Sequence, residues 1–289
     1  MPNASELRVA PRRHSLARRA AVRECEALAL ALGGRALYRA RHLRPPGLRV
    51  RRERVVRPDL PDELHGLRVV QFSDVHAGPF VRAGDLRAAI ELANALEPDL
   101  VAITGDLITH RAEDAELVRA DLAQLRARHG VFGVFGNHDY RGRREDEIAQ
   151  RWAASGMRFL RNEGVRIERG AAALCVVGVE DLEEARELDL ERARACVRPG
   201  DFELALCHNP RGALAFVRPS CLAVLCGHTH GTQLDLPILR RVGPPHPGLR
   251  VQSGSTAILV SRGLGSIGLP LRIGAPTELV LLELERGRA

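Results

Sequence analysis

The sequence predicts an α/β protein in which a second sheet packs on the first, and three patterns support this. Short apolar runs typical of buried strands alternate with stretches of helical periodicity at residues 84–96, 114–128, 145–155 and 183–196. Runs at 164–168 and 173–179 form a close pair, and runs at 250–260 and 277–285 lack long helices between them. The alternation indicates α/β layering, and the later runs favour the second sheet.

The first two strand-like runs each lead into residues of types that bind metal ions. Residues 67–72 lead into Ser73-Asp74-Val75-His76, and residues 100–103 lead into Thr104-Gly105-Asp106. Taken singly, each motif is more often a turn than a site, because aspartate and glycine are common turn residues. In open α/β sheets, however, the site lies beyond the carboxyl ends of the strands, which is where these side chains are expected.

The third and fourth runs end in the same residue types. Residues 131–135 lead into Gly136-Asn137-His138-Asp139, and residues 202–207 lead into His208. The first motif would also serve as a cap for the helix that follows it, because asparagine and aspartate favour that position. A single histidine such as His208 is more often a satisfied core residue than a ligand. When each motif is considered alone, a turn, a helix cap or a core histidine is favoured over a metal site.

The fifth run, residues 221–226, leads into Gly227-His228-Thr229-His230-Gly231. On an extended backbone, side chains two residues apart point the same way, so both imidazoles are able to face one site. Imidazole suits Zn, Fe, Mn, Ni and Cu. Because all five strand ends repeat one set of nitrogen and oxygen ligands, the structural alternatives fail jointly, and the sequence predicts a metal site.

The chain resembles the calcineurin-like metallophosphoesterase superfamily over roughly residues 67 to 285, with the motifs in that family's order. The resemblance is carried by Asp74-x-His76, Gly105-Asp106, Gly136-Asn137-His138-Asp139, His208 and Gly227-His228-x-His230. It implies a β-sandwich of two mixed sheets flanked by helices. Ser261-Arg262-Gly263-Leu264-Gly265 is similar to a bacterial branch that often has an N-terminal membrane or twin-arginine-type segment. Thr232 departs from that branch, which usually has a second glycine there.

The resemblance also implies the ligands of two metal ions. The first ion would be bound by Asp74, His76, Asp106 and His230, and the second by Asp106 as the bridge together with Asn137, His208 and His228. The mixture of oxygen and nitrogen ligands suits Mn, Fe, Zn or Ni better than Mg or Ca, and we expect Mn. No thiolate belongs to the set, so a structural zinc site is not expected.

The resemblance implies hydrolysis of a phosphate mono- or diester, and two bound metal ions would activate the attacking water. His138 is the predicted general acid for the leaving group, and Asp139 is expected to hydrogen-bond and orient its imidazole. A lipid-linked or nucleotide pyrophosphate is one substrate that the sequence leaves open. Two alternatives are a nuclease of the same superfamily and a protein-binding scaffold without activity.

The charge of the chain is divided between two predicted regions. Residues 1–57, a basic N-terminal segment and linker, contain 15 Arg and four Glu, a net charge of +11. The whole chain is +7, so residues 58–289, the predicted catalytic domain, sum to −4. Nucleic acid is therefore a disfavoured partner for that domain.

The role of the basic segment stays open between peripheral membrane contact through residues 1–45 and a solvated helix packed on the domain. The six cysteines show no Cys-x-x-Cys spacing, which is typical of free thiols in a reducing compartment. We therefore expect a cytoplasmic protein. Export through a degenerate twin-arginine-like signal at Arg12-Arg13 is the alternative.

Overall fold

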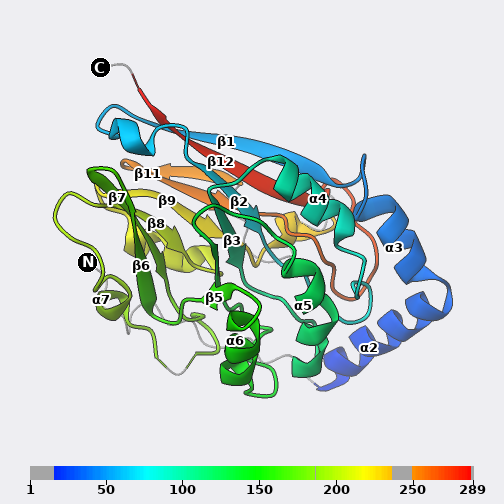
Figure 1. Ribbon diagram of the computed structural model, residues 1–289. Coiled ribbons are helices and arrows are strands. Elements are labelled where there is room, and N and C mark those ends of the chain that lie inside the picture. Colours follow the sequence, from blue (N-terminus) through cyan, green and yellow to red (C-terminus); the bar gives the residue numbers. More distant parts are fainter. Residues whose placement is uncertain (1–15, 186, 236–248, 288–289) are drawn as a thin grey trace.

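The computed structural model describes residues 16–185, 187–235 and 249–287, and it contains two sheets of six strands each (Figure 1). In spatial order, the first sheet consists of β1 (Arg49–Arg57), β12 (Glu278–Arg286), β2 (Arg68–Phe72), β3 (Leu100–Thr104), β4 (Val131–Val134) and β5 (Met157–Phe159). The second consists of β10 (Arg250–Ser253), β11 (Thr256–Val260), β9 (Cys221–Cys226), β8 (Phe202–Leu206), β7 (Ala172–Gly178) and β6 (Glu163–Arg169). Both sheets are mixed, because β12 runs antiparallel to β2, and β10 and β6 run antiparallel to their neighbours. The predicted fold class is confirmed.

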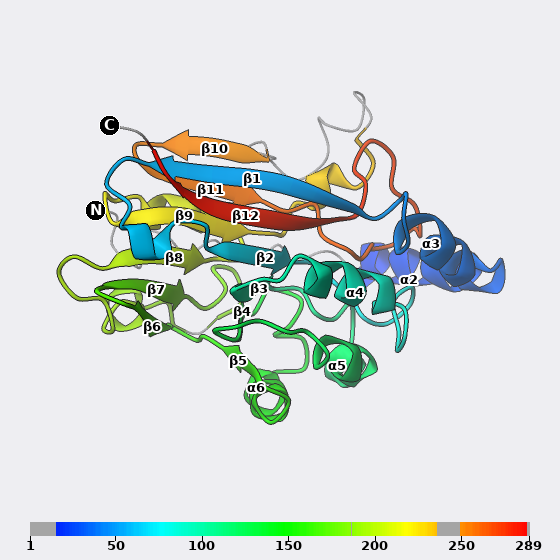
Figure 2. The same cartoon turned by 45° about the horizontal axis from the view of Figure 1, so that its top comes forward.

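Alternating side chains place the core on both faces of each sheet. In β2, Val69 packs between the sheets, whereas Val70 packs on the outer face under the helices. The second sheet shows the same alternation, with Leu204 between the sheets and Ala205 outside. Figure 2 shows the two stacked sheets and the helices that flank the first one.

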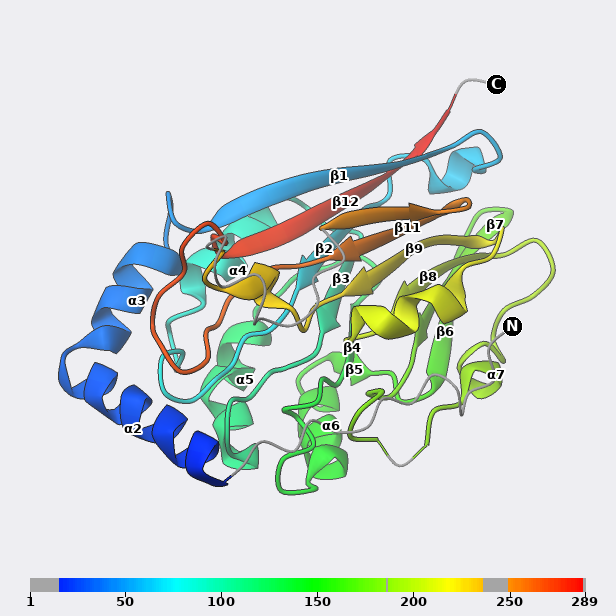
Figure 3. The same cartoon turned by 180° about the vertical axis from the view of Figure 1, so that it is seen from behind.

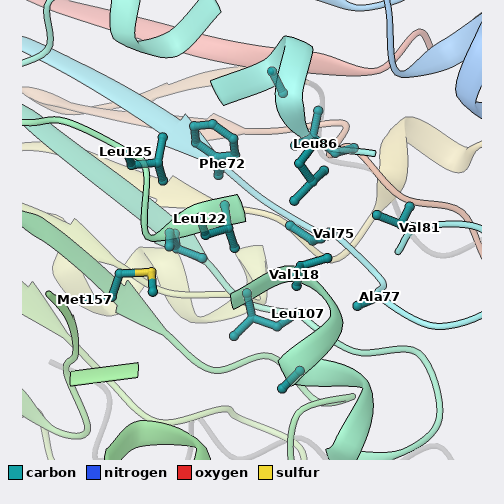
Figure 4. Close-up of a cluster of buried hydrophobic side chains, with 14 of the residues drawn as sticks. Phe72, Val75, Ala77, Val81, Leu86, Leu107, Val118, Leu122, Leu125 and Met157 are labelled. Atoms are coloured by element: carbon teal, nitrogen blue, oxygen red, sulfur yellow. The ribbon is translucent and has the colours of Figure 1, made fainter. Parts of the chain in front are cut away.

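Most of the described helices cover the outer faces of the sheets. The α-helices are α2 (Leu16–Ala31), α3 (Gly34–His42), α4 (Arg87–Ala95), α5 (Glu116–Leu122), α6 (Glu145–Ala153) and α7 (Leu190–Ala193), and the 3₁₀ turns are η1 (Asp62–Leu64), η2 (Ala112–Ala115), η3 (Pro210–Phe216) and η4 (His230–Thr232). Figure 4 shows the apolar layer beneath α5, where Val118 and Leu122 lie near Leu107 and Phe72. This layer anchors the loops that follow β2 and β3.

The helix predicted for residues 183–196 is wrong, because among the residues described in this range only those of α7 are helical. The Asp181 carboxylate accepts hydrogen bonds from the backbone N–H groups of Glu183 and Glu184, both at 2.9 Å. The Asp189 carboxylate accepts one from the N–H of Arg192 at 2.8 Å. The Asp189 bond caps the N-terminus of α7, and because Asp189 itself has an extended backbone, no helix runs through it.

The N-terminal part of the chain contributes both helices and a strand. β1 lies at the edge of the first sheet and pairs in parallel with β12. α2 and α3 lie together at one end of the molecule (Figures 1 and 3). None of the helices within residues 16–185, 187–235 and 249–287 combines the length and apolar character needed to cross a bilayer. Arg12-Arg13 lies outside these ranges, and the division of the chain at residue 57 stays a prediction.

Candidate metal centre

Strands from both sheets deliver the predicted ligands to one buried site. Asp74 and His76 follow β2, Asp106 follows β3, and Asn137 follows β4. The second sheet contributes the other three, His208 after β8 and His228 and His230 after β9. The structure brings all seven side chains together, as the following distances show.

Four of these residues form a first group. The ligand-type atoms of Asp74, His76, Asp106 and His230 all lie within 4.8 Å of one another. The Nε2 atoms of His76 and His230 are 3.0 Å apart. His76 Nε2 lies 3.5 Å from Asp106 Oδ2, and His230 Nε2 lies 3.5 Å from Asp74 Oδ1. All four residues are buried.

A second group shares Asp106 with the first. Asp106, His208 and His228 also place their ligand-type atoms within 4.8 Å of one another. His208 Nε2 lies 3.4 Å from Asp106 Oδ2, and His228 Nδ1 lies 3.3 Å from His208 Nε2. The Asn137 side-chain oxygen lies 3.2 Å from His228 Nδ1. A carboxylate that belongs to two adjoining groups is the arrangement expected of a bridge between two cations.

Five of these residues have left-handed backbone conformations, with φ values of 48° for Asp74, 49° for His76, 52° for Asp106, 72° for His228 and 53° for His230. This region is unfavourable for residues with a Cβ and occurs most often at functional sites. Glycines leave room for it: a Cβ on Gly136 would lie 2.4 Å from Asp106 Oδ1, and one on Gly227 would lie 2.4 Å from Asp74 Oδ2. These loops therefore adopt unfavourable backbone conformations that hold the five side chains together.

The charges of the site compensate one another through its shared carboxylate. Burial opposes ionisation of Asp106, but the imidazoles of His208 and His138 outweigh it and hold the pKa of that carboxyl well below its usual range. Burial likewise opposes protonation of His208, but Asp106 and Asp74 raise its pKa well above the ordinary value. A buried set of carboxylates and imidazoles that face one another fits divalent cations.

The contact predicted between Asp139 and His138 is absent, and each side chain has other partners. The predicted hydrogen bond between Asp139 and the His138 imidazole is not formed, because His138 Nδ1 lies 2.9 Å from the carbonyl oxygen of Thr109 instead. The Asp139 carboxylate is occupied by backbone N–H groups, accepting from Gly136 at 2.8 Å and from Leu107 at 2.7 Å. Asp139 thus fixes the backbone on both sides of His138 rather than its ring.

Comparison with known proteins decides the family. The model of the family described as calcineurin-like phosphoesterase matches residues 67–232. The chain belongs to this family. The resemblance inferred from the motifs is therefore confirmed.

Relatives of this calcineurin-like phosphoesterase occur in bacteria and animals. It is 30% identical over 272 residues to the uncharacterized metallophosphoesterase YkuE of Bacillus subtilis (strain 168), covering 89% of this chain and 92% of that protein. It is 34% identical over 242 residues to the Danio rerio transmembrane protein with metallophosphoesterase domain, covering 78% of this chain and 55% of that protein. The chain thus spans about half the length of that relative and of the one from Bos taurus. Among solved structures, the NAD nucleotidase of Haemophilus influenzae aligns with a TM-score of 0.46 and 13% identity over 69% of this chain and 45% of that one.

The departure of this phosphoesterase at Thr232 is visible in its backbone. Thr232 has a φ of 67°, a left-handed conformation that is an outlier for a β-branched residue. Its hydroxyl donates to the carbonyl of Gly231 at 2.7 Å, and its N–H donates to the carbonyl of Thr229 at 2.8 Å. The loop therefore keeps a conformation that glycine would adopt at lower cost.

Several residues around the phosphoesterase site were not predicted from the sequence. Arg272 is buried, and its guanidinium lies 3.2 Å from His230 Nδ1. Glu183 places a carboxylate oxygen 3.7 Å from His228 Nε2, and the carbonyl oxygen of Thr104 lies 2.8 Å from His208 Nδ1. The two acceptors, Glu183 and the Thr104 carbonyl, are partners of the kind that orient ligand imidazoles. A backbone carbonyl carries no signal in the sequence, and Arg272 lies outside every motif.

The three arginines of the loop that follows Asp139 have different surroundings. Arg143 pairs with Glu184 at 3.3 Å, and Arg144 pairs with Glu147 at 2.6 Å, both away from the metal ligands. Arg141 instead approaches the site, with its Nη2 atom 3.3 Å from His138 Nε2.

Proposed function

We propose that the protein is a dinuclear metal-dependent phosphoesterase that hydrolyses small phosphate mono- or diesters. The observation that supports this most strongly is the pair of buried ligand groups that share Asp106. Asp74, His76, Asp106 and His230 would hold one ion, and Asp106, Asn137, His208 and His228 would hold the other. When bound, two divalent ions supply the charge that activates water and neutralises phosphoryl oxygens. We favour Mn.

His138 is the proposed general acid. Its Nδ1 lies against the carbonyl of Thr109, which can only accept, so the proton on Nδ1 is fixed and Nε2 is the atom that exchanges a proton. Asp139 is a positioning residue, because its carboxylate ties the loop after β3 to the loop that carries His138. This geometry allows His138 to protonate the leaving oxygen as the phosphorus–oxygen bond breaks.

The decisive test is hydrolysis by the Mn-loaded protein of p-nitrophenyl phosphate, a monoester, and bis-p-nitrophenyl phosphate, a diester. Turnover of either, abolished in Asp106→Asn, would support the proposal, and the ratio of the two rates would define the preference. A protein that binds metal but hydrolyses neither ester would point to the scaffold alternative. Cleavage of a DNA oligonucleotide in preference to both esters would favour the nuclease.

We also propose that the N-terminal helices contact an anionic membrane surface. Leu28 on α2 and Leu32, one residue beyond its end, are 63% and 79% exposed, and Leu37 on α3 is 55% exposed. Exposed leucines on an arginine-rich segment are typical of interfacial helices. Co-sedimentation with phosphatidylglycerol vesicles should fall in Leu28→Gln/Leu32→Gln, whereas Leu214→Gln, an exposed leucine on η3, should bind as the wild type does. Equal binding by all three proteins would contradict membrane contact through these helices.

A further inference from the structure

A continuous chain of polar contacts joins the N-terminal helix α2 to the proposed general acid. Glu26 of α2 contacts His110 at 2.6 Å, His110 contacts Arg141 at 3.1 Å, and Arg141 contacts His138 at 3.3 Å. Glu26 lies 84 residues before His110, so the contact is made by the fold and not by local sequence. None of the predicted motifs includes Glu26 or His110.

Arg141 and Glu26, at the two ends of this series of contacts, determine which atoms of His110 donate and accept hydrogen bonds. Arg141 can only donate, so Nδ1 of His110 accepts its hydrogen bond. The proton of neutral His110 is then on Nε2, where it is donated to the Glu26 carboxylate. The positive guanidinium and the negative carboxylate are thus linked by one neutral imidazole.

Glu26 is held in place independently of His110. Its side chain is 3% exposed, and its other oxygen accepts a hydrogen bond from the backbone N–H of Gly268 at 3.0 Å. A buried carboxylate with two fixed partners is a rigid anchor. The carbonyl of Thr109 accepts from both Arg141 and His138, which sets the two side chains beside each other.

The position of Arg141 relative to His138 has a direct consequence for substrate. Because Arg141 can only donate, it donates to the unprotonated Nε2 of His138 in the free protein, and this is the atom that would carry the proton for the leaving group. A leaving-group oxygen that hydrogen-bonds to Nε2 therefore comes within reach of the same guanidinium. An arginine there would stabilise the negative charge that develops on this oxygen.

We propose that Arg141 contacts the leaving-group oxygen of the substrate and that Glu26 and His110 are positioning residues that hold Arg141 there, so that α2 completes the active site. The inference rests on the proposed phosphoesterase function and adds a residue to the leaving-group side. It assigns a role to part of the basic N-terminal segment that is separate from membrane contact.

The test compares two aryl monoesters, phenyl phosphate with a poor leaving group and p-nitrophenyl phosphate with a good one, on Mn-loaded variants. For phenyl phosphate, Arg141→Gln should lower kcat about 100-fold and Glu26→Gln about tenfold, the order expected for losing an oxyanion donor and an outer partner. The p-nitrophenyl rates should change much less, since that leaving group needs little stabilisation. The double variant should be no slower than Arg141→Gln, because both changes act through one guanidinium.

Matched controls separate this role from a structural one. Arg143→Gln removes a neighbouring guanidinium that pairs with Glu184, and it should keep the wild-type ratio of the two rates. In metal-free protein, Glu26→Gln should shift the imidazole ¹⁵N resonances of both His110 and His138, whereas Arg143→Gln should not. Unchanged rate ratios in folded, metal-binding Arg141→Gln and Glu26→Gln would overturn the inference. Failure of the wild type to hydrolyse either ester would instead overturn the proposed function.

Discussion

The Nε2 atoms of His76 and His230 face each other 3.0 Å apart, although 154 residues separate them in the chain. His208 Nε2 and His228 Nδ1 face each other in the same way at 3.3 Å. Facing imidazole nitrogens are typical of a cation site, where the ion accepts a lone pair from each ring. In the proposed dinuclear site each facing pair would hold one ion, and the two histidines of Gly227-His228-Thr229-His230 would divide between the two ions.

Single alanine substitutions should remove these ions one at a time. His230→Ala should impair the site of Asp74 and His76, and His228→Ala should impair the site of Asn137 and His208. Metal content measured by mass spectrometry should fall from two ions per chain toward one in each variant. Crystallographic occupancy would show which ion is lost, and loss of the same ion from both variants would contradict the division.

His138→Ala should keep its metal ions and lose turnover on substrates with poor leaving groups. The side chain belongs to neither ligand group, and its Nδ1 is committed to the carbonyl of Thr109. General acid catalysis contributes about 10²–10⁴-fold when the leaving group needs a proton. Rates with alkyl phosphates should fall by this order, while p-nitrophenyl phosphate is affected less. Equal turnover of alkyl phosphates by both proteins would rule out the role.

The clustering of the candidate ligands was predictable because its signal is local. Each ligand follows a short apolar run, and strand ends collect at one edge of a sandwich, so types and spacing sufficed for residues such as Asp106 and His208. The Asp139–His138 contact was not predictable in this way. The partner of His138 Nδ1 is the carbonyl of Thr109 and not the carboxylate of Asp139. Because every residue has a backbone carbonyl, the sequence gives no sign of which one will accept.

Contacts made across long sequence separations were the second kind of information that the sequence lacked. Glu26 and Arg272 contribute to the site only because α2 and the loop before β12 pack against it. The failed helix at 183–196 has a different cause. Helical periodicity was present there, but Asp189 has an extended backbone and caps α7, so no helix runs through it.

The metal-free protein should lose stability as the pH rises from about 4 to about 7. Burial and the nearby charge of Asp106 raise the pKa of Asp139 to about 7. Because this folded-state value exceeds the unfolded one, the contribution of Asp139 is complete below the unfolded pKa and is lost as pH rises through about 7. The loss occurs between about pH 4 and pH 7, at up to about 1.4 kcal/mol per pH unit, and stability levels off above that range. Urea unfolding of metal-free wild type and Asp139→Asn should show a steeper pH dependence in the wild type, and identical slopes would contradict it.

Adjacent valines of β1 should differ sharply in their contribution to stability. Val55 is 4% exposed and packs between the sheets, whereas Val56 points outward and is 53% exposed. Val55→Ala should lower the free energy of unfolding by about 2 kcal/mol through lost burial and a residual cavity, and Val56→Ala by less than about 0.5 kcal/mol. Chemical denaturation measures both. Similar effects would mean that β1 is not a full member of the sandwich.

Thr232→Gly should stabilise the protein. A left-handed conformation costs a residue with a Cβ about 1–2 kcal/mol, and glycine avoids this cost. Glycine also increases the conformational entropy of the unfolded chain, which offsets part of the gain. The net gain should be about 0.5–1 kcal/mol in urea unfolding. Thr229→Gly is the matched control, because Thr229 has an ordinary φ of −88° and should only be destabilised by the change. Destabilisation of equal size in both variants would show that the hydroxyl of Thr232, which donates to the carbonyl of Gly231, outweighs the backbone strain.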